Sequence, residues 1–153
     1  MKSVAATRRW MCSVVFVSAV GWPGQGYAQF GIGTTWVRTD AQGKGMSMSV
    51  EACCNGGLRL IYHIPSMGGQ PATTLTVDSP MDGREVPALV GGKSSGETMA
   101  IKRVDDHHYT AVLKMNGQTF GTSSGTVSAD GKSLTVESVM QGAEKTVETW
   151  VRK

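Results

Sequence analysis

The chain has 153 residues, with 15 lysine and arginine residues against 12 aspartate and glutamate residues. Three of the basic residues and none of the acidic ones lie within residues 1–28, so the rest of the chain carries 12 of each sign. That remainder has no run of lysine or arginine to follow a phosphate backbone, and its aromatic residues are few and scattered. We therefore expect no nucleic-acid partner.

The first 28 residues have the pattern of a secretory signal peptide. An apolar run from Met11 to Val20 follows three basic residues and precedes small residues at a cleavage point, Gly26-Tyr27-Ala28. The run is shorter than the roughly 20 residues of a membrane-spanning helix, so we expect cleavage after Ala28 and no membrane span afterwards. The mature chain, residues 29–153, would be a single domain in the periplasm or secreted. Arg8-Arg9 leaves open whether export uses the general or the twin-arginine route.

The first half of the mature chain predicts short β-strands. Residues 29–45 are rich in glycine and threonine around Trp36-Val37, which indicates an opening segment with a first strand. Met46 to Cys53 and Leu58 to Ile64 then alternate with a period of two, typical of strands. Asn55-Gly56-Gly57 lies between them, so we expect a hairpin there.

Two more strands and two connections are expected before the middle of the chain. Thr73 to Asp78 predicts a strand, and Ser79 to Gly83 a turn. Val86 to Val90 predicts a short strand, and Pro87 within it favours an edge position because proline cannot donate a hydrogen bond to a neighbouring strand. Gly91 to Gly96 is interpreted as a flexible loop.

The region from Glu97 to Ser138 predicts a β-meander, and Lys145 to Arg152 a last strand. Alternating runs there are separated by turn residues that a helix would not tolerate. Asn116-Gly117 and Asp130-Gly131 favour two-residue hairpin turns, because these residues accept the positive φ that such turns need. Counted together, the runs predict an all-β fold of nine or ten short antiparallel strands. We expect an up-and-down meander closed into a small barrel, with a two-sheet sandwich as the alternative.

Four motifs in the second half resemble a family of small secreted bacterial proteins of unassigned function. In order along the chain they are MDGREVP (81–87), ETMAIKRVDD (97–106), LKMNGQTF (113–120) and VSADGKSLTVES (127–138). The resemblance covers mainly residues 81–153, and it implies a lipocalin-like or fatty-acid-binding-like β-meander. These motifs are turns and strands, so they imply an architecture and no catalytic residues.

Two clusters could carry metal or redox chemistry. Asp105-Asp106-His107-His108 combines carboxylates with imidazoles, but neighbouring residues on a strand point to opposite faces, so we favour a turn over a metal site. Cys53 and Cys54 could form a vicinal disulfide or a soft-metal site. Consecutive Cα atoms are closer than a disulfide usually spans, so we favour two separate thiols at a strand end, with an intermolecular disulfide as a lesser alternative.

No arrangement for nucleophilic catalysis, phosphate binding or cofactor binding is recognisable in the sequence, and we expect neither enzymatic activity nor a cofactor. The favoured interpretation is a barrel that binds a small hydrophobic or amphipathic ligand. The alternative is a structural or protein-interaction module with a filled interior and an unknown partner. A barrel would turn one face of three strands inward, which gives the candidate ligand-binding residues Leu60, Tyr62, Met99, Ile101, Tyr109 and Leu113.

Overall fold

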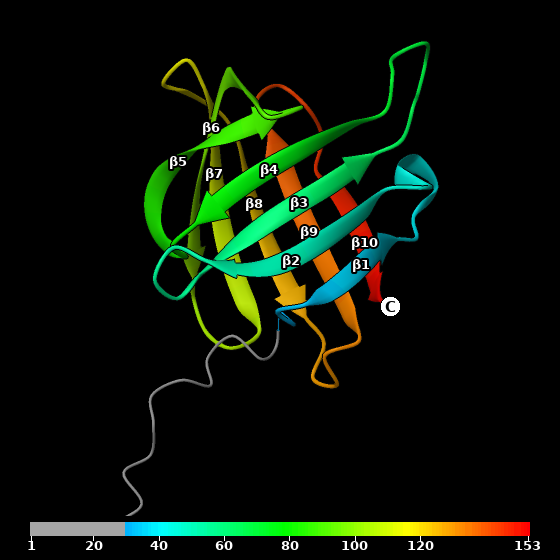
Figure 1. Ribbon diagram of the computed structural model, residues 1–153, viewed down its shortest axis with the longest axis vertical. Helices are drawn as coiled ribbons and strands as arrows, with labels where there is room; N and C mark the ends of the chain where they lie inside the picture. The colour runs from blue at the N-terminus through cyan, green and yellow to red at the C-terminus, as the bar shows by residue number, and fades with distance from the viewer. Residues whose placement is uncertain (1–29) are drawn as a thin grey trace, which may run out of the picture.

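The computed structural model describes residues 30–153, so the predicted signal peptide lies outside the described residues. Within this range the chain forms one short 3-10 helix, η1 (Ala41–Gly43), and ten β-strands (Figure 1). The strands are β1 (Thr34–Arg38), β2 (Ser47–Cys53), β3 (Gly57–Ile64), β4 (Thr73–Ser79), β5 (Asp82–Val90), β6 (Lys93–Arg103), β7 (His108–Met115), β8 (Gln118–Val127), β9 (Ser133–Met140) and β10 (Thr146–Arg152).

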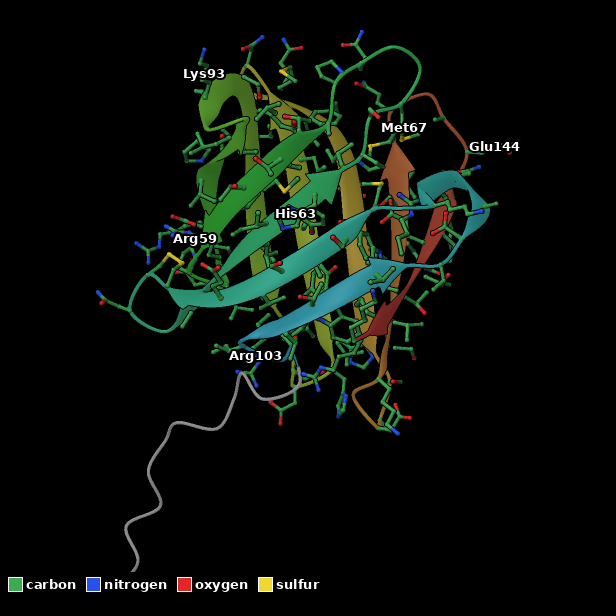
Figure 2. The ribbon with its side chains drawn as sticks, turned by 45° about the vertical axis from the view of Figure 1, so that its right-hand side comes forward. Arg59, His63, Met67, Lys93, Arg103 and Glu144 are labelled. Carbon is green, nitrogen blue, oxygen red and sulfur yellow. A yellow bond between two sulfur atoms is a disulfide. The ribbon has the colours of Figure 1, made fainter. Side chains whose placement is uncertain are left out.

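Each strand pairs antiparallel with its neighbours in sequence, and β1 pairs with β10, so the sheet closes into a barrel. The predicted all-β class, strand number and up-and-down order are confirmed, and the sandwich alternative is wrong. In Figure 1 the connections alternate between two ends of the barrel. We call the end with the β2–β3, β4–β5, β6–β7 and β8–β9 connections the base, and the opposite end the upper end. Figure 2 shows Lys93, Met67 and Glu144 towards the upper end and Arg103 at the base.

The β7–β8 hairpin forms as its sequence predicts. Asn116 and Gly117 have φ values of 49° and 82°, and the last cross-strand pair before them is Met115 with Gln118. This is the two-residue turn that the Asn-Gly pair favours, and its twist matches that of the two strands.

The β8–β9 connection differs from the prediction. Asp130-Gly131 was expected to form a two-residue turn, but the connection runs from Ser128 to Lys132. The Gly131 amide donates to the Ser128 carbonyl at 2.8 Å, and the Asp130 carboxylate accepts from the Lys132 amide at 3.0 Å. The side chain of Asp130 thus organises a longer turn, which the dipeptide alone does not reveal.

Three predictions around β5 are also wrong. The strand begins at Asp82, not Val86, and the expected loop over Gly91–Gly96 is a short turn followed by β6 from Lys93. Pro87 does not mark an edge, because β5 pairs with both β4 and β6. The pairing with β4 reaches only from Val90 to Ala88, and a register shift towards β6 follows Pro87. Proline is tolerated because it lies just beyond the β4 ladder and at a bulge.

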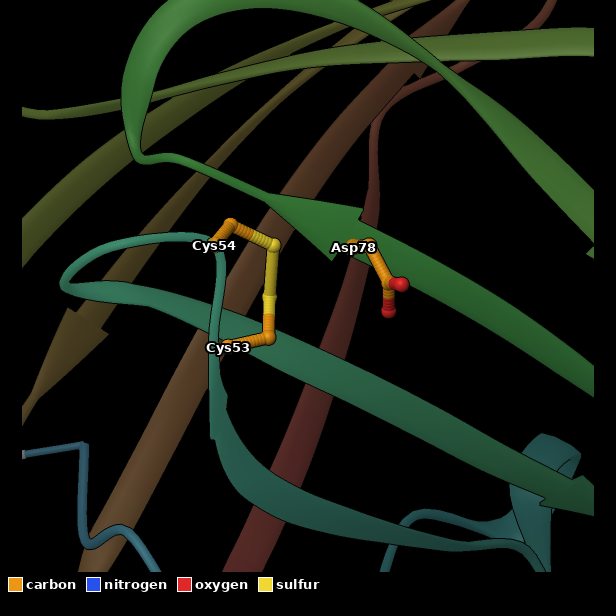
Figure 3. Close-up of side chains that lie close together, drawn as sticks. All are labelled: Cys53, Cys54 and Asp78. Atoms are coloured by element: carbon orange, nitrogen blue, oxygen red, sulfur yellow. A yellow bond between two sulfur atoms is a disulfide. The ribbon is translucent and has the colours of Figure 1, made fainter.

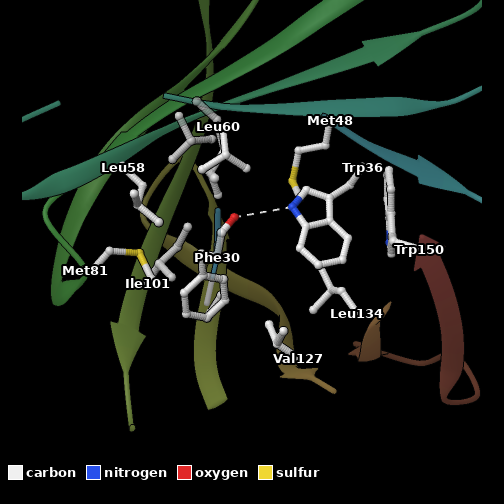
Figure 4. Packing of buried hydrophobic residues seen from close by; sticks show 14 residues of the cluster. Phe30, Trp36, Met48, Leu58, Leu60, Met81, Ile101, Val127, Leu134 and Trp150 are labelled. Carbon is white, nitrogen blue, oxygen red and sulfur yellow. Dashed lines mark hydrogen bonds between the residues drawn. The ribbon is translucent and has the colours of Figure 1, made fainter. Parts of the chain in front are cut away.

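A hydrophobic core packs inside the barrel (Figure 4) and extends to the base. Trp36 and Leu58 are fully buried, and Phe30 closes the base from below, with its carbonyl 3.4 Å from the donating Trp36 Nε1. The Arg152 guanidinium carbon lies 5.5 Å from the centre of the Trp36 ring. Trp36 is therefore covered on several sides, and the residues around it form the dense part of the molecule.

Candidate functional site

A cavity of about 200 Å³ occupies the barrel interior above the core. All six candidate residues predicted from the sequence line it, namely Leu60, Tyr62, Met99, Ile101, Tyr109 and Leu113. They converge because residues two apart on a strand share a face and the closed sheet turns that face inward. Met99 of β6 lies opposite Leu113 of β7, and Ile101 lies opposite Ala111. The predicted grouping of these residues is therefore present, while their role in binding stays a prediction.

The remaining lining residues were not singled out from the sequence. They are Met46, Met48, Ile64, Leu75, Ala111, Ser123, Leu134, Val136, Ser138, Met140, Glu148 and Trp150. The alternation of Leu134, Val136 and Ser138 was visible, but which strands would face β3 and β6 depends on how the barrel closes. The β1–β10 pairing brings β10 round to the wall, and with it Glu148 and Trp150.

Among residues 30–153, Glu148 contributes the one charged side chain that lines the cavity. Its Oε1 lies 3.1 Å from Nη1 of Arg38, and its Oε2 accepts from Trp150 Nε1 at 3.2 Å. Arg38 also holds Asp40, with Nε 2.6 Å from Oδ2 and Nη2 3.0 Å from Oδ1. The hydrogen bond from Arg38 is the main reason that the pKa of Asp40 falls from its ordinary value to about 2.

Two of the residues that line the cavity are tyrosines, which carry hydroxyl groups. Tyr62 packs edge-on against Trp150, with ring centres 6.1 Å apart, and Tyr109 packs against Phe30 at 5.5 Å. Within residues 30–153 neither hydroxyl has a hydrogen-bond partner. Burial, and then the Glu148 charge, raise the pKa of Tyr62, so this hydroxyl stays protonated and able to donate. Burial also raises the pKa of Tyr109.

The position of Tyr109 depends on a glycine in the neighbouring strand. Gly125 of β8 lies directly opposite Tyr109. A Cβ atom added to Gly125 would lie 2.0 Å from Cε1 of the tyrosine ring. Because Gly125 has no side chain, the Tyr109 ring can lie where a Cβ atom would otherwise be.

Cys53 and Cys54 form a vicinal disulfide, so the prediction of two separate thiols is wrong (Figure 3). The physical reason lies in the β2–β3 connection. Cys54 and Asn55 have φ values of 54° and 52°, so the backbone leaves the strand at Cys54 and no longer points consecutive side chains to opposite faces. The prediction assumed that the regular strand continues through Cys54, but the strand ends at Cys53.

The disulfide lies beside Asp78, and these three residues come close enough together to suggest a metal centre. However, the two Asp78 carboxylate oxygens accept from Arg59, at 2.7 Å from Nε and 2.8 Å from Nη2. Both sulfur atoms are joined to each other. The cluster is thus a disulfide next to an ion pair, and in this state its ligand atoms are engaged.

Residues 105–107 lie in the β6–β7 connection, in agreement with the turn that the sequence favours, and His108 begins β7. Asp105 Oδ1 accepts from the backbone amides of His107 and His108, both at 2.8 Å. The rings point apart: His107 Nδ1 lies 3.2 Å from the Val127 carbonyl, and His108 Nδ1 lies 2.8 Å from the Asp105 carboxylate. The carboxylate of Asp105 therefore caps the β6–β7 connection.

No protein-family model matches the sequence, and no curated protein matches it. Among solved structures, the chain is similar to the fluorescent protein UnaG, with a TM-score of 0.56 and 14% sequence identity. The alignment covers 82% of this chain and 98% of that chain. At this identity the similarity shows a shared barrel fold and carries no information about chemistry. None of the helical segments within residues 30–153 has the length and apolar character that crossing a membrane requires.

Proposed function

We propose that the protein is an exported, non-catalytic β-barrel that binds a small apolar or amphipathic molecule. The observation that carries the proposal is the interior cavity of about 200 Å³. A barrel that served only as a scaffold would be more stable with a filled interior, since unfilled volume costs packing energy. The lining is dominated by apolar side chains with a few hydroxyl groups, which is the usual composition of a binding site for small organic molecules.

The size of the cavity limits the ligand to one or two rings or a short chain. An apolar cavity of about 150 Å³ holds a benzene molecule, whereas sites for larger ligands exceed about 300 Å³. Burial of about 200 Å² of apolar ligand surface contributes about 5 kcal/mol at about 25 cal/mol per Å². Loss of motion and ordering of side chains reduce this gain, so we expect micromolar or weaker affinity.

Titration with naphthylmethanol, a neutral fluorescent two-ring probe, tests the proposal. Wild-type protein is expected to bind it saturably. Leu113→Lys places a charged amine at a lining position that is 9% exposed, and binding should weaken by about tenfold or more. Val112→Lys is the matched control, because Val112 is the next residue on β7 and faces the other side of the sheet.

Both variants need melting curves and near-ultraviolet circular dichroism to show that they fold. Failure of the wild type to bind any apolar probe would reject the proposal, and so would an equal loss of binding in both variants. The interaction-module alternative would then take its place.

The export part of the proposal rests on the pattern of residues 1–28. Expression of the full chain in a bacterial host, followed by N-terminal sequencing, should give a mature protein that begins at Gln29. An uncut chain retained in the inner membrane would contradict it.

A further inference from the structure

The electrostatics of the cavity restrict which small molecules fit it. Glu148 contributes the one charge on the lining formed by residues 30–153. Its side chain is 27% exposed and lies on β10, opposite Val136 of β9, another lining residue. Charges act over longer distances in a site walled by apolar side chains than in water, because the surroundings screen them poorly.

Arg38 does not cancel this charge. Its guanidinium makes two hydrogen bonds to Asp40, at 2.6 and 3.0 Å, and reaches Glu148 at 3.1 Å with its remaining terminal nitrogen, Nη1. Nη1 also approaches the Met46 sulfur at 3.7 Å. The group of three side chains thus contains one cation and two anions, and its net charge is negative. The Arg38 side chain is 11% exposed, and its guanidinium is already engaged by both carboxylates.

Apart from the Trp150 N–H, which donates to Glu148, the other side-chain hydrogen-bonding groups on the lining are hydroxyls. Tyr62 and Tyr109 have hydroxyls without a partner among the described residues. Ser123 of β8 and Ser138 of β9 lie directly opposite each other in the sheet and add two more. Hydroxyls donate and accept hydrogen bonds, so they suit a ligand with an alcohol, amine or carbonyl group as well as one with a formal charge. The selectivity against a charge of one sign must therefore come from Glu148.

We propose that the cavity binds uncharged or amine-bearing compounds of one or two rings and discriminates against carboxylates. The inference rests on the proposed function and deepens it by naming the ligand class. A carboxylate inside the cavity would lose its hydration while facing the negative Asp40–Arg38–Glu148 group. An amine would gain an ion pair with Glu148, and a neutral hydroxyl compound would gain hydrogen bonds to the hydroxyls without that cost.

Three probes that share a naphthyl group test the inference by fluorescence titration at neutral pH: naphthylmethanol, naphthylmethylamine and naphthoate. They differ mainly in charge, so their affinities isolate the electrostatic contribution. With wild-type protein, the alcohol and the amine are expected to bind about tenfold or more tightly than the carboxylate. This ranking needs no variant and decides the inference even where a substitution impairs folding.

The Glu148→Gln variant tests whether Glu148 causes this selectivity. Glutamine keeps one oxygen, which can accept from either Arg38 or Trp150 Nε1, while the charge is removed. The ratio of amine to carboxylate affinity should fall by about tenfold or more. Glu137→Gln is the matched control, because Glu137 lies on β9 between the lining residues Val136 and Ser138 and pairs with Lys145 at 2.8 Å away from the cavity. Its ratio should stay at the wild-type value.

The outcomes separate the inference from the proposed function. If none of the three probes binds, both are overturned. If naphthoate binds as tightly as the alcohol or more tightly, the cavity is a binding site but the charge inference is wrong. An unchanged ratio in a folded Glu148→Gln variant would also overturn the inference, because the selectivity would then have another source.

Discussion

The two halves of the barrel interior are built by the same ten strands and yet differ in packing. At the base, Trp36, Leu58 and Val127 are each at most 2% exposed, and the space that Leu58 borders is only about 20 Å³. Towards the upper end the interior leaves about 200 Å³ open. Since the same strands form the wall of both halves, the inward-facing side chains decide where the barrel is solid and where it is hollow.

Those side chains differ in a simple way. The base contains two large aromatic rings, Phe30 and Trp36, and the Arg152 guanidinium stacked against Trp36. The wall of the upper half includes small residues, Ala111, Ser123 and Ser138, which leave space, and several methionines, which adapt to whatever shares that space. The comparison indicates that the base supplies most of the packing and that the upper half contains the cavity proposed as the binding site.

The largest expected effect is a difference in stability between two alanine variants, one from each half. Trp36→Ala should lower the free energy of unfolding by about 3 to 5 kcal/mol, because it removes a fully buried ring from dense packing. Met140→Ala should cost about 1 kcal/mol, because Met140 is half-buried and already borders open space. Urea unfolding measures both. Equal losses in the two variants would remove the distinction between a packed base and a hollow upper half.

A turn at the upper end is the next test. Gly117→Val should destabilise the protein by about 1 to 2 kcal/mol, because a β-branched residue resists the φ of 82° at this position. No atom lies within 4 Å of the place where the added Cβ would be, so the cost comes from the backbone and not from a clash. Gln118→Val, one residue further and in the strand, is the control and should change little. Melting temperatures that are unchanged in Gly117→Val would argue against the tight turn.

Acid should weaken the network beside the cavity. The pKa of Asp40 is about 2 in the folded protein, below its ordinary value, mainly because Arg38 donates to it. Because the pKa is lower in the folded state, ionised Asp40 contributes to the free energy of unfolding. This contribution is fully present above about pH 4 and disappears as the pH falls towards 2. Solvent screening reduces the contribution to about 1 kcal/mol. Urea unfolding between pH 7 and pH 2 should show a loss of unfolding free energy in the wild type that is absent in Asp40→Asn. Parallel plots of unfolding free energy against pH for the two proteins would contradict this.

The smallest effect is expected at the disulfide. Cys53 and Cys54 do not line the cavity, and their link closes a very short loop of chain, so it restricts the unfolded state little. Replacing both with serine should change stability by about 1 kcal/mol or less and leave probe binding at the wild-type level. Titration with naphthylmethanol measures the second point. Loss of binding in a folded double variant would connect the β2–β3 turn to the site.

Much of this organisation could be predicted from the sequence. The period of two placed Leu60, Tyr62, Met99, Ile101, Tyr109 and Leu113 on inward faces, and Asn116-Gly117 marked its hairpin correctly. These features are local, since alternation and turn residues act over two to eight residues. A closed barrel with consecutive hairpins then follows from the number of strands and the short connections between them.

What sequence reasoning missed depends on contacts between distant residues or on backbone angles at single positions. Glu148 was missed because β10 turns its Glu148 and Trp150 face inward, while Val147 and Val151 on its more apolar-looking face are 49% and 45% exposed. Pro87 is tolerated by an irregular ladder, and the disulfide by the positive φ of Cys54. In each case the three-dimensional setting overrides an expectation that was reasonable for a regular strand.

The two tryptophans of the mature chain allow the central claim to be tested in one spectrum. In protein that begins at Gln29, as the proposed cleavage would give, the indole N–H groups are those of Trp36, which donates at the base, and Trp150, which donates to Glu148 beside the cavity. Titration of nitrogen-labelled protein with naphthylmethanol should shift the Trp150 indole signal progressively and leave the Trp36 signal in place. A shift of Trp36 alone, or of neither signal at saturating probe, would contradict a binding site in the upper half of the barrel.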